Sequence, residues 1–219
     1  SENEDLTSKV IRSTNRQTEV KEQDLIAFSN FQKRLEDYYK TFTGEDSLFY
    51  ERRSKQYNNK SIEKKRIIDK TTQMKTIASI YYNKPELATR YFGTLFTELG
   101  DKLFKDNHEM FPYYTAAYVY YKIENMFRQN KINRKYKKIK YHLLTMIRNE
   151  INKTKCPNFE SKKSVEYCEE ILSKVKNEIE INKIIISVIK KIDKLKFNLE
   201  DNEISKSKEF VKKILEYYR

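Results

Sequence analysis

Glycine and proline are scarce in this chain, with three of each in 219 residues. Because these two residue types mark turns, their scarcity predicts long helices joined by few tight turns. So few glycines also leave no glycine-rich segment that could cradle a phosphate group. Nucleotide hydrolysis is therefore not supported by the sequence.

Cysteine and histidine are scarce as well: the chain has Cys156 and Cys168, and His108 and His142. Two cysteines cannot build a disulfide framework, and a structural zinc site would need further Cys or His ligands close by. A Ser or Cys nucleophile also lacks a suitable histidine partner. We therefore expect reduced thiols, no metal site, no cofactor and no catalytic residues in this chain.

Long apolar runs are missing too. No stretch approaches the length of about 18 residues that a membrane span requires, and no basic-then-apolar amino terminus indicates a secretory signal. We expect a cytoplasmic protein without membrane contact. The chain begins at Ser1 without a methionine, and we interpret it as a piece of a longer protein.

Amphipathic periodicity, in contrast, is abundant. Apolar residues recur at steps of three and four, which is the spacing of one helix face. Helices are expected over residues 24–43, 71–82, 85–92, 95–104, 112–128, 133–152 and 205–218. Aromatic and β-branched residues near 47–54 and 65–69 favour short strands. The predicted fold class is mainly α: a multi-helix bundle with at most one short β-hairpin near residues 48–69.

A polar segment with Pro157 marks a boundary at residues 152–163. Beyond it, apolar residues follow a heptad-like spacing over residues 165–195, and we expect a break near Asn182 that gives two antiparallel helices. We predict a helical domain over residues 1–152 and a C-terminal helical hairpin or bundle over 153–219 that packs on it. The segment 165–195 is also a candidate surface for homo-oligomer formation or partner docking.

The net charge of +13 is concentrated in two places. Lys and Arg outnumber Asp and Glu by nine to three in residues 51–75 and by eleven to two in residues 120–159. Clustered positive charge is typical of a protein with a polyanion partner. The alternative is a solvated lysine-rich surface. The chain has 34 lysines and 11 arginines, and codon drift in an AT-rich genome also produces such an excess of lysine.

Nucleic acid, either RNA or DNA, is the partner that these clusters favour. Arg and Lys hold phosphates, and Tyr50 and Tyr57 in the first cluster are of the kind that stacks on bases, which suits single strands or structured RNA. The candidate contacts in the two clusters are Arg52, Arg53, Lys55, Lys64, Lys65, Arg66, Lys131, Arg134, Lys135, Lys137 and Lys138.

A nuclease is the competing hypothesis. Asp46 and the triplet Glu63-Lys64-Lys65 have the residue types of a metal-dependent nuclease site, an acid followed by acid-x-Lys. Such triplets also arise by chance in a chain with 35% charged residues. A metal-free ribonuclease of the helical kind would need a His four to six residues after an Arg. Arg134 and His142 are too far apart for that pattern. We favour binding by the cationic clusters over either chemistry.

Two side-chain amides near the amino terminus, Asn15 and Gln17, are further candidate contacts. Amides can bind adenine edges or the backbone of a nucleic acid, but they also cap helices, which is the role we favour. Their segment belongs to an ordered set of residues that resembles the abortive infection phage resistance (AIPR) protein family. The set is Thr14, Asn15, Gln17, Asp24, Leu25, Gln32, Leu35, Phe49, Tyr50, Glu51, Arg52, Arg53, Pro85, Ala88 and Phe104.

The resemblance covers roughly residues 6–130. It implies a bacterial cytoplasmic protein of phage defence, in which the infected cell stops supporting phage growth. Members of the family usually have an additional amino-terminal half, and we expect it to be missing from this chain. We therefore interpret the chain as a non-catalytic recognition region, either nucleic-acid-binding or partner-docking, of an abortive infection protein.

Overall fold

The periodic segments form helices. A computed structural model describes residues 30–219 of the chain. Its α-helices are α2 (Asn30–Lys40), α3 (Lys70–Tyr81), α4 (Pro85–Ala88), α5 (Phe92–Leu99), α6 (Phe111–Arg128), α7 (Lys140–Ile151), α8 (Lys163–Lys176), α9 (Glu178–Lys194) and α10 (Lys208–Glu216). Short 3₁₀ helices are η1 (Gly44–Asp46), η2 (Lys64–Arg66), η3 (Gly100–Lys102), η4 (Arg134–Ile139) and η5 (Ile204–Lys206). The predicted fold class, mainly α, is confirmed.

The small β element lies where the sequence predicts it. Strands β1 (Phe49–Glu51) and β2 (Ile67–Asp69) pair with Tyr50 opposite Ile68. They run parallel, whereas the strands of a hairpin run antiparallel. The reason is the connection over residues 52–66, which is long enough to carry the chain back to the start of β1 before β2 begins.

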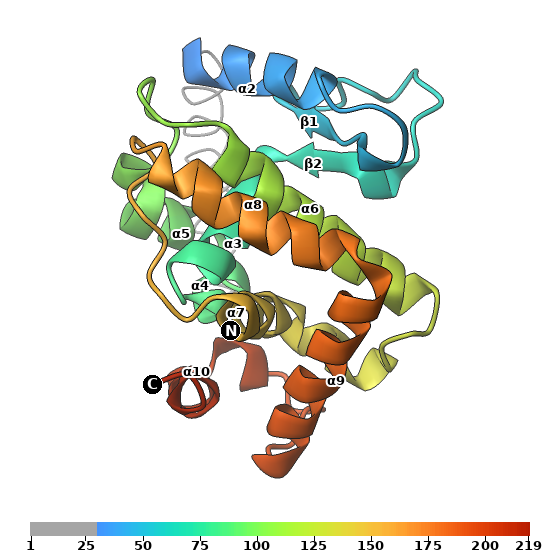
Figure 1. The fold of residues 1–219 in the computed structure, drawn as a ribbon, viewed down its shortest axis with the longest axis vertical. Coiled ribbons are helices and arrows are strands. Elements are labelled where there is room, and N and C mark those ends of the chain that lie inside the picture. The colour runs from blue at the N-terminus through green and yellow to red at the C-terminus, as the bar shows by residue number, and fades with distance from the viewer. Residues whose placement is uncertain (1–29) are drawn as a thin grey trace, which may run out of the picture.

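Helices α3, α6 and α7 form the centre of the molecule (Figure 1). Asp69 starts α3, because its carboxylate accepts a hydrogen bond from the Thr72 amide at 2.6 Å and so caps the first turn. Buried polar contacts then join α7 to α3: the Thr145 hydroxyl donates to the Ser79 carbonyl, and Arg148 Nε donates to the Ile80 carbonyl, each at 2.7 Å.

Tyrosines fill much of the core between α2, β1 and α6. Tyr39, Tyr50, Tyr113 and Tyr114 are almost completely buried. Their hydroxyls find partners, as a buried phenol requires. Tyr39 donates to Gln73 Oε1 at 2.5 Å, and Tyr114 donates to the Asp46 carbonyl at 2.6 Å. The abundance of tyrosine is therefore in part a packing feature.

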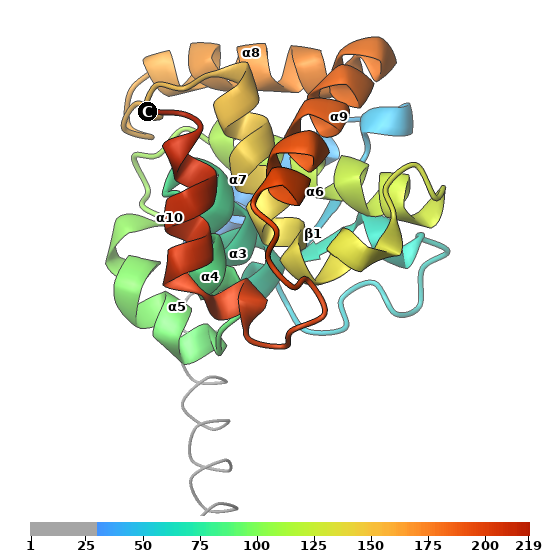
Figure 2. The same cartoon turned by 90° about the horizontal axis from the view of Figure 1, so that it is seen from below.

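The C-terminal helices cover the centre from one side. Helix α8 packs along α6, and α9 turns away from it at Asn177 (Figure 1). The break lies at Asn177 and not near Asn182, because the Asn177 side chain accepts the amides of Ile179 and Glu180 and caps α9. Helix α10 packs beside α4 and α7 (Figure 2).

One continuous apolar cluster contains residues from both sides of residue 152. The division into domains over 1–152 and 153–219 stays a prediction. Within residues 30–219, no helix is both long and apolar enough to cross a membrane.

Candidate nucleic-acid interface

The candidate residues differ in how the fold uses them. Asn15 and Gln17 lie outside the described residues. Arg52 is buried, and its Nε donates to a Glu36 carboxylate oxygen at 2.9 Å. Gln56 donates to the other oxygen of Glu36 at 2.7 Å. Burial raises the pKa of Glu36, but the hydrogen bonds from Arg52 and Gln56 outweigh it and lower the pKa overall. The structure therefore uses Arg52 to join β1 to α2.

The other cations of the first cluster face solvent or the edge of η2. Arg53, Lys55 and Lys64 are exposed and form no ion pair within residues 30–219. Lys65 and Arg66 are partly buried and both reach Glu63, at 3.2 and 3.3 Å. Three of these cations are therefore unpaired within residues 30–219, and the other two are partly neutralised by Glu63.

Arg66 has the most contacts of this cluster. Its Nη1 donates to the carbonyls of Glu45 and Ser47, at 3.0 and 2.7 Å. Its guanidinium carbon lies 5.1 Å from the centre of the Tyr121 ring, a cation–π arrangement. Arg66 thus fixes the η2 segment against α6.

The second cluster is built on η4, which Asn133 caps by accepting the Lys135 amide at 2.9 Å. Tyr136 and Ile139 turn into the core, and the four cations of η4 point outward. Two of them have neighbours: Lys135 lies 3.5 Å from Asp193, and Lys138 donates to Asn202 at 3.0 Å. The other two, Arg134 and Lys137, are exposed and form no ion pair with any described residue.

The two clusters meet at a groove of about 230 Å³, which we call the cationic groove. Its lining combines η1, η2, the middle and end of α6, the turn that follows and the start of α9. The residues are Glu45, Lys65, Arg66, Tyr118, Tyr121, Lys122, Asn125, Met126, Gln129, Lys131 and Glu178. The groove thus brings Lys65 and Arg66 of the first cluster together with Lys131 of the second.

Lys122 belongs to this groove, and sequence reasoning missed it. It stands between apolar residues of α6, so a count of charge along the chain does not single it out. Both Lys122 and Lys131 pair with Glu178, the latter at 3.3 Å. The hydrogen bond from Lys122 is the largest influence on Glu178 and lowers the pKa of its carboxyl. A phosphate group could therefore take the place of the Glu178 carboxylate beside these two lysines.

The residues of the two nuclease patterns have other roles. Glu63 is engaged by Lys65 and Arg66. His142 is completely buried, and its ring packs against Phe210 at a centroid distance of 5.1 Å. Within residues 30–219, no group of three or more His, Cys, Asp and Glu side chains is arranged to hold a metal ion.

Comparison with known families identifies the chain. The AIPR protein family matches residues 1–210, which is nearly the whole chain and extends well past residue 130. Searches of curated proteins and of solved structures gave no match. Several residues of the family pattern, Gln32, Leu35, Tyr50 and Ala88 among them, are buried, whereas Arg53 is exposed. The chain therefore belongs to the AIPR family, the abortive infection phage resistance proteins.

Proposed function

We propose that this chain is a non-catalytic, nucleic-acid-binding region of a bacterial, cytoplasmic phage-defence protein. Membership of the AIPR family supports the role in defence. The observation that carries the binding proposal is the cationic groove, where two clusters distant in sequence share one lining. If the lysines formed only a solvated surface, there would be no reason for the two clusters to line the same groove.

The groove supplies the chemistry that a single strand or structured RNA requires. Lys122 and Lys131 hold a phosphate once it displaces Glu178, since all three groups are within ion-pair contact. The amides of Asn125 and Gln129 also line the groove and offer hydrogen bonds to sugar or base. The exposed cations that follow or precede the groove residues in the sequence, Lys64, Arg134 and Lys137, then hold the neighbouring phosphates of the strand.

The experiment is fluorescence anisotropy with labelled single-stranded RNA, single-stranded DNA and duplex DNA. The groove-flank variant Lys64→Gln, Arg134→Gln, Lys137→Gln removes three exposed cations that form no ion pair within residues 30–219. The matched control removes three exposed lysines of α8 and α10: Lys163→Gln, Lys208→Gln, Lys212→Gln. Both variants change the net charge equally, and surface changes of this kind cost about 0.5 kcal/mol of stability or less.

We expect the groove-flank variant to bind RNA at least about tenfold more weakly than the control variant in low salt. Equal weakening of both variants would show that the total charge and not the groove binds the strand. No binding below about 100 μM in low salt would end the proposal, because nonspecific sites usually reach that affinity.

A second candidate function is self-association through α9. Ile179 and Ile186 are exposed by 67% and 54%, and they lie seven residues apart, which is the heptad spacing of a helix contact. Most other apolar residues of 165–195 are buried against the chain's own core. Sedimentation velocity at rising concentration tests this candidate. A dimer that Ile179→Lys, Ile186→Lys abolishes supports it, and a wild-type monomer at the highest concentration excludes it.

A further inference from the structure

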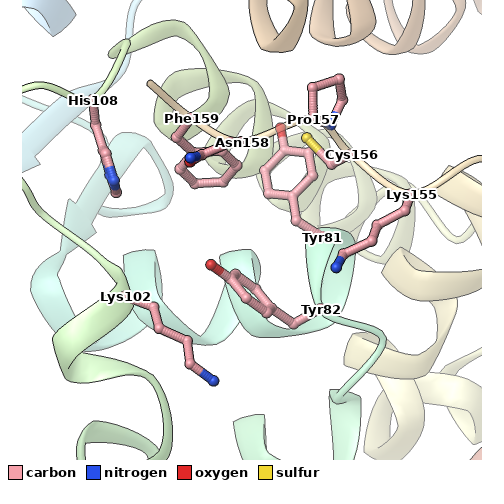
Figure 3. A pocket seen from close by; sticks show the side chains of 9 residues that line it. All are labelled: Tyr81, Tyr82, Lys102, His108, Lys155, Cys156, Pro157, Asn158 and Phe159. Carbon is pink, nitrogen blue, oxygen red and sulfur yellow. The ribbon is translucent and has the colours of Figure 1, made fainter. Parts of the chain in front are cut away.

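A second cavity of about 440 Å³ lies at the other end of α6 from the cationic groove. Its lining comes from the end of α3, the segment between η3 and α6, and the segment before α8 (Figure 3). The residues are Tyr81, Tyr82, Lys102, His108, Lys155, Cys156, Pro157, Asn158 and Phe159. Its size falls within the range of small-molecule sites, roughly 300–1,000 Å³.

The charge of this lining is positive only. Lys102 and Lys155 are its charged residues, and no Asp or Glu contributes to it. Both lysines are exposed and neither forms an ion pair with a described residue. In Figure 3 the Lys155 side chain points toward the middle of the cavity. The cavity is therefore suited to an anion, and the groups that would bind it are not already neutralised.

His108 adds a hydrogen-bond donor of defined tautomer. The Tyr113 hydroxyl accepts a hydrogen bond from the Phe104 amide at 2.7 Å and lies 2.8 Å from His108 Nδ1. The Tyr113 hydroxyl has no other hydrogen-bond acceptor within residues 30–219, so we assign its hydrogen to Nδ1, which leaves the imidazole proton on Nε2. Burial lowers the pKa of His108, which keeps the ring neutral. Its Nε2–H is left as a donor for a ligand.

Aromatic rings supply the apolar part of the cavity. Phe159 is buried and packs edge-on against Tyr81 at 5.3 Å. The Tyr81 hydroxyl is occupied, since it donates to the Pro112 carbonyl at 2.9 Å. The Tyr82 hydroxyl, in contrast, points toward the middle of the cavity (Figure 3). A flat ring can therefore stack on the partly exposed ring of Tyr82, with hydrogen-bond partners around it.

We propose that this cavity binds a free mononucleotide, with its phosphate beside Lys155 and its base against Tyr82. The Nε2–H of His108 donates a hydrogen bond to the sugar or base. The side-chain amide of Asn158 can both donate to and accept from the same groups. Cations without carboxylates favour the phosphate, and the aromatic walls favour the base. This site is separate from the cationic groove and does not depend on it.

Isothermal titration calorimetry with AMP, GMP, CMP and UMP tests the proposal, with adenosine and inorganic phosphate as partial ligands. We expect at least one mononucleotide to bind, and adenosine or phosphate alone to bind at least about tenfold more weakly. The variant Lys102→Gln, Lys155→Gln should weaken mononucleotide binding by about tenfold or more. The control Lys153→Gln, Lys162→Gln removes two exposed lysines that are near Lys155 in sequence but outside the lining, and should bind normally.

The absence of binding by all four mononucleotides would overturn the proposal, as would equal weakening by both lysine variants. The groove-flank variant separates this inference from the proposed function, because it should bind the mononucleotide as the wild type does. Conversely, Lys102→Gln, Lys155→Gln should leave the affinity for labelled RNA unchanged.

Discussion

Buried polar side chains differ in how well the fold satisfies them. The core tyrosines donate to carbonyl or amide oxygens, whereas neither ring nitrogen of His142 has a hydrogen-bond partner within residues 30–219. Burial lowers the pKa of His142 to about 3. The folded chain therefore holds this imidazole neutral at a pH at which the unfolded chain protonates it.

His142 should make the protein sensitive to mild acid. Since the unfolded pKa is about 6.5, the unfolded state gains protons first as the pH falls, and stability declines from about pH 6.5 downward. At about pH 5 the loss from this residue is about 2 kcal/mol. His142→Leu should therefore reduce the loss of unfolding free energy between about pH 7 and pH 5 by that amount, measured by urea denaturation. Parallel pH profiles of variant and wild type would contradict this assignment.

Single residues also show where sequence reasoning ends. Arg52 and Arg53 are adjacent and chemically alike, yet one is buried beside Glu36 and the other is exposed. The alternation along a strand predicts that they face opposite sides, but no local pattern identifies the carboxylate that one of them meets. Lys122 was missed for a similar reason, because its neighbours in the groove come from other elements.

At the scale of elements, the part of the family pattern that lies on α2 and β1 forms a packing arrangement between them. The Tyr50 hydroxyl donates to Gln32, and Leu35 of α2 is completely buried. Tyr57 reaches back to donate to the Tyr50 carbonyl at 3.2 Å. Together with the pair of Arg52 and Glu36, these contacts attach α2 to the strand pair.

Loss of the Arg52 side chain should therefore weaken the attachment of α2. Arg52→Ala leaves the largely buried Glu36 with fewer donors, and we expect a cost of about 2 kcal/mol in unfolding free energy. Arg53→Ala is the matched control and should change stability by about 0.5 kcal/mol or less. Urea denaturation of both variants gives the comparison. Equal effects would mean that the ion pair does not contribute as described.

Secondary-structure elements could be predicted where the spacing of apolar residues along the sequence marks them. The steps of three and four placed α3, α6 and α7, because each of these helices packs against several neighbours. The direction of β2 was not predictable, because it depends on the path of residues 52–66 through space. The break was predicted at the wrong residue because the apolar spacing continues across Asn177, and only the side-chain cap that starts α9 marks the break there.

For the whole molecule, the central observation is the distribution of charge. The two cationic clusters are separated by α3, α4, α5 and α6 in sequence, but both contribute to the lining of one groove. Several of their members are partly neutralised by Glu63, Glu178 and Asp193. Binding of a polyanion should therefore depend on the cations that form no such pairs.

The salt dependence of RNA binding tests this account most directly. If about six phosphates are engaged, the logarithm of the association constant for single-stranded RNA should fall with the logarithm of salt with a slope of about −4. The groove-flank variant, with three cations fewer, should show a slope of about −2, and the control variant of α8 and α10 lysines should keep about −4. Equal slopes for the two variants would contradict the account.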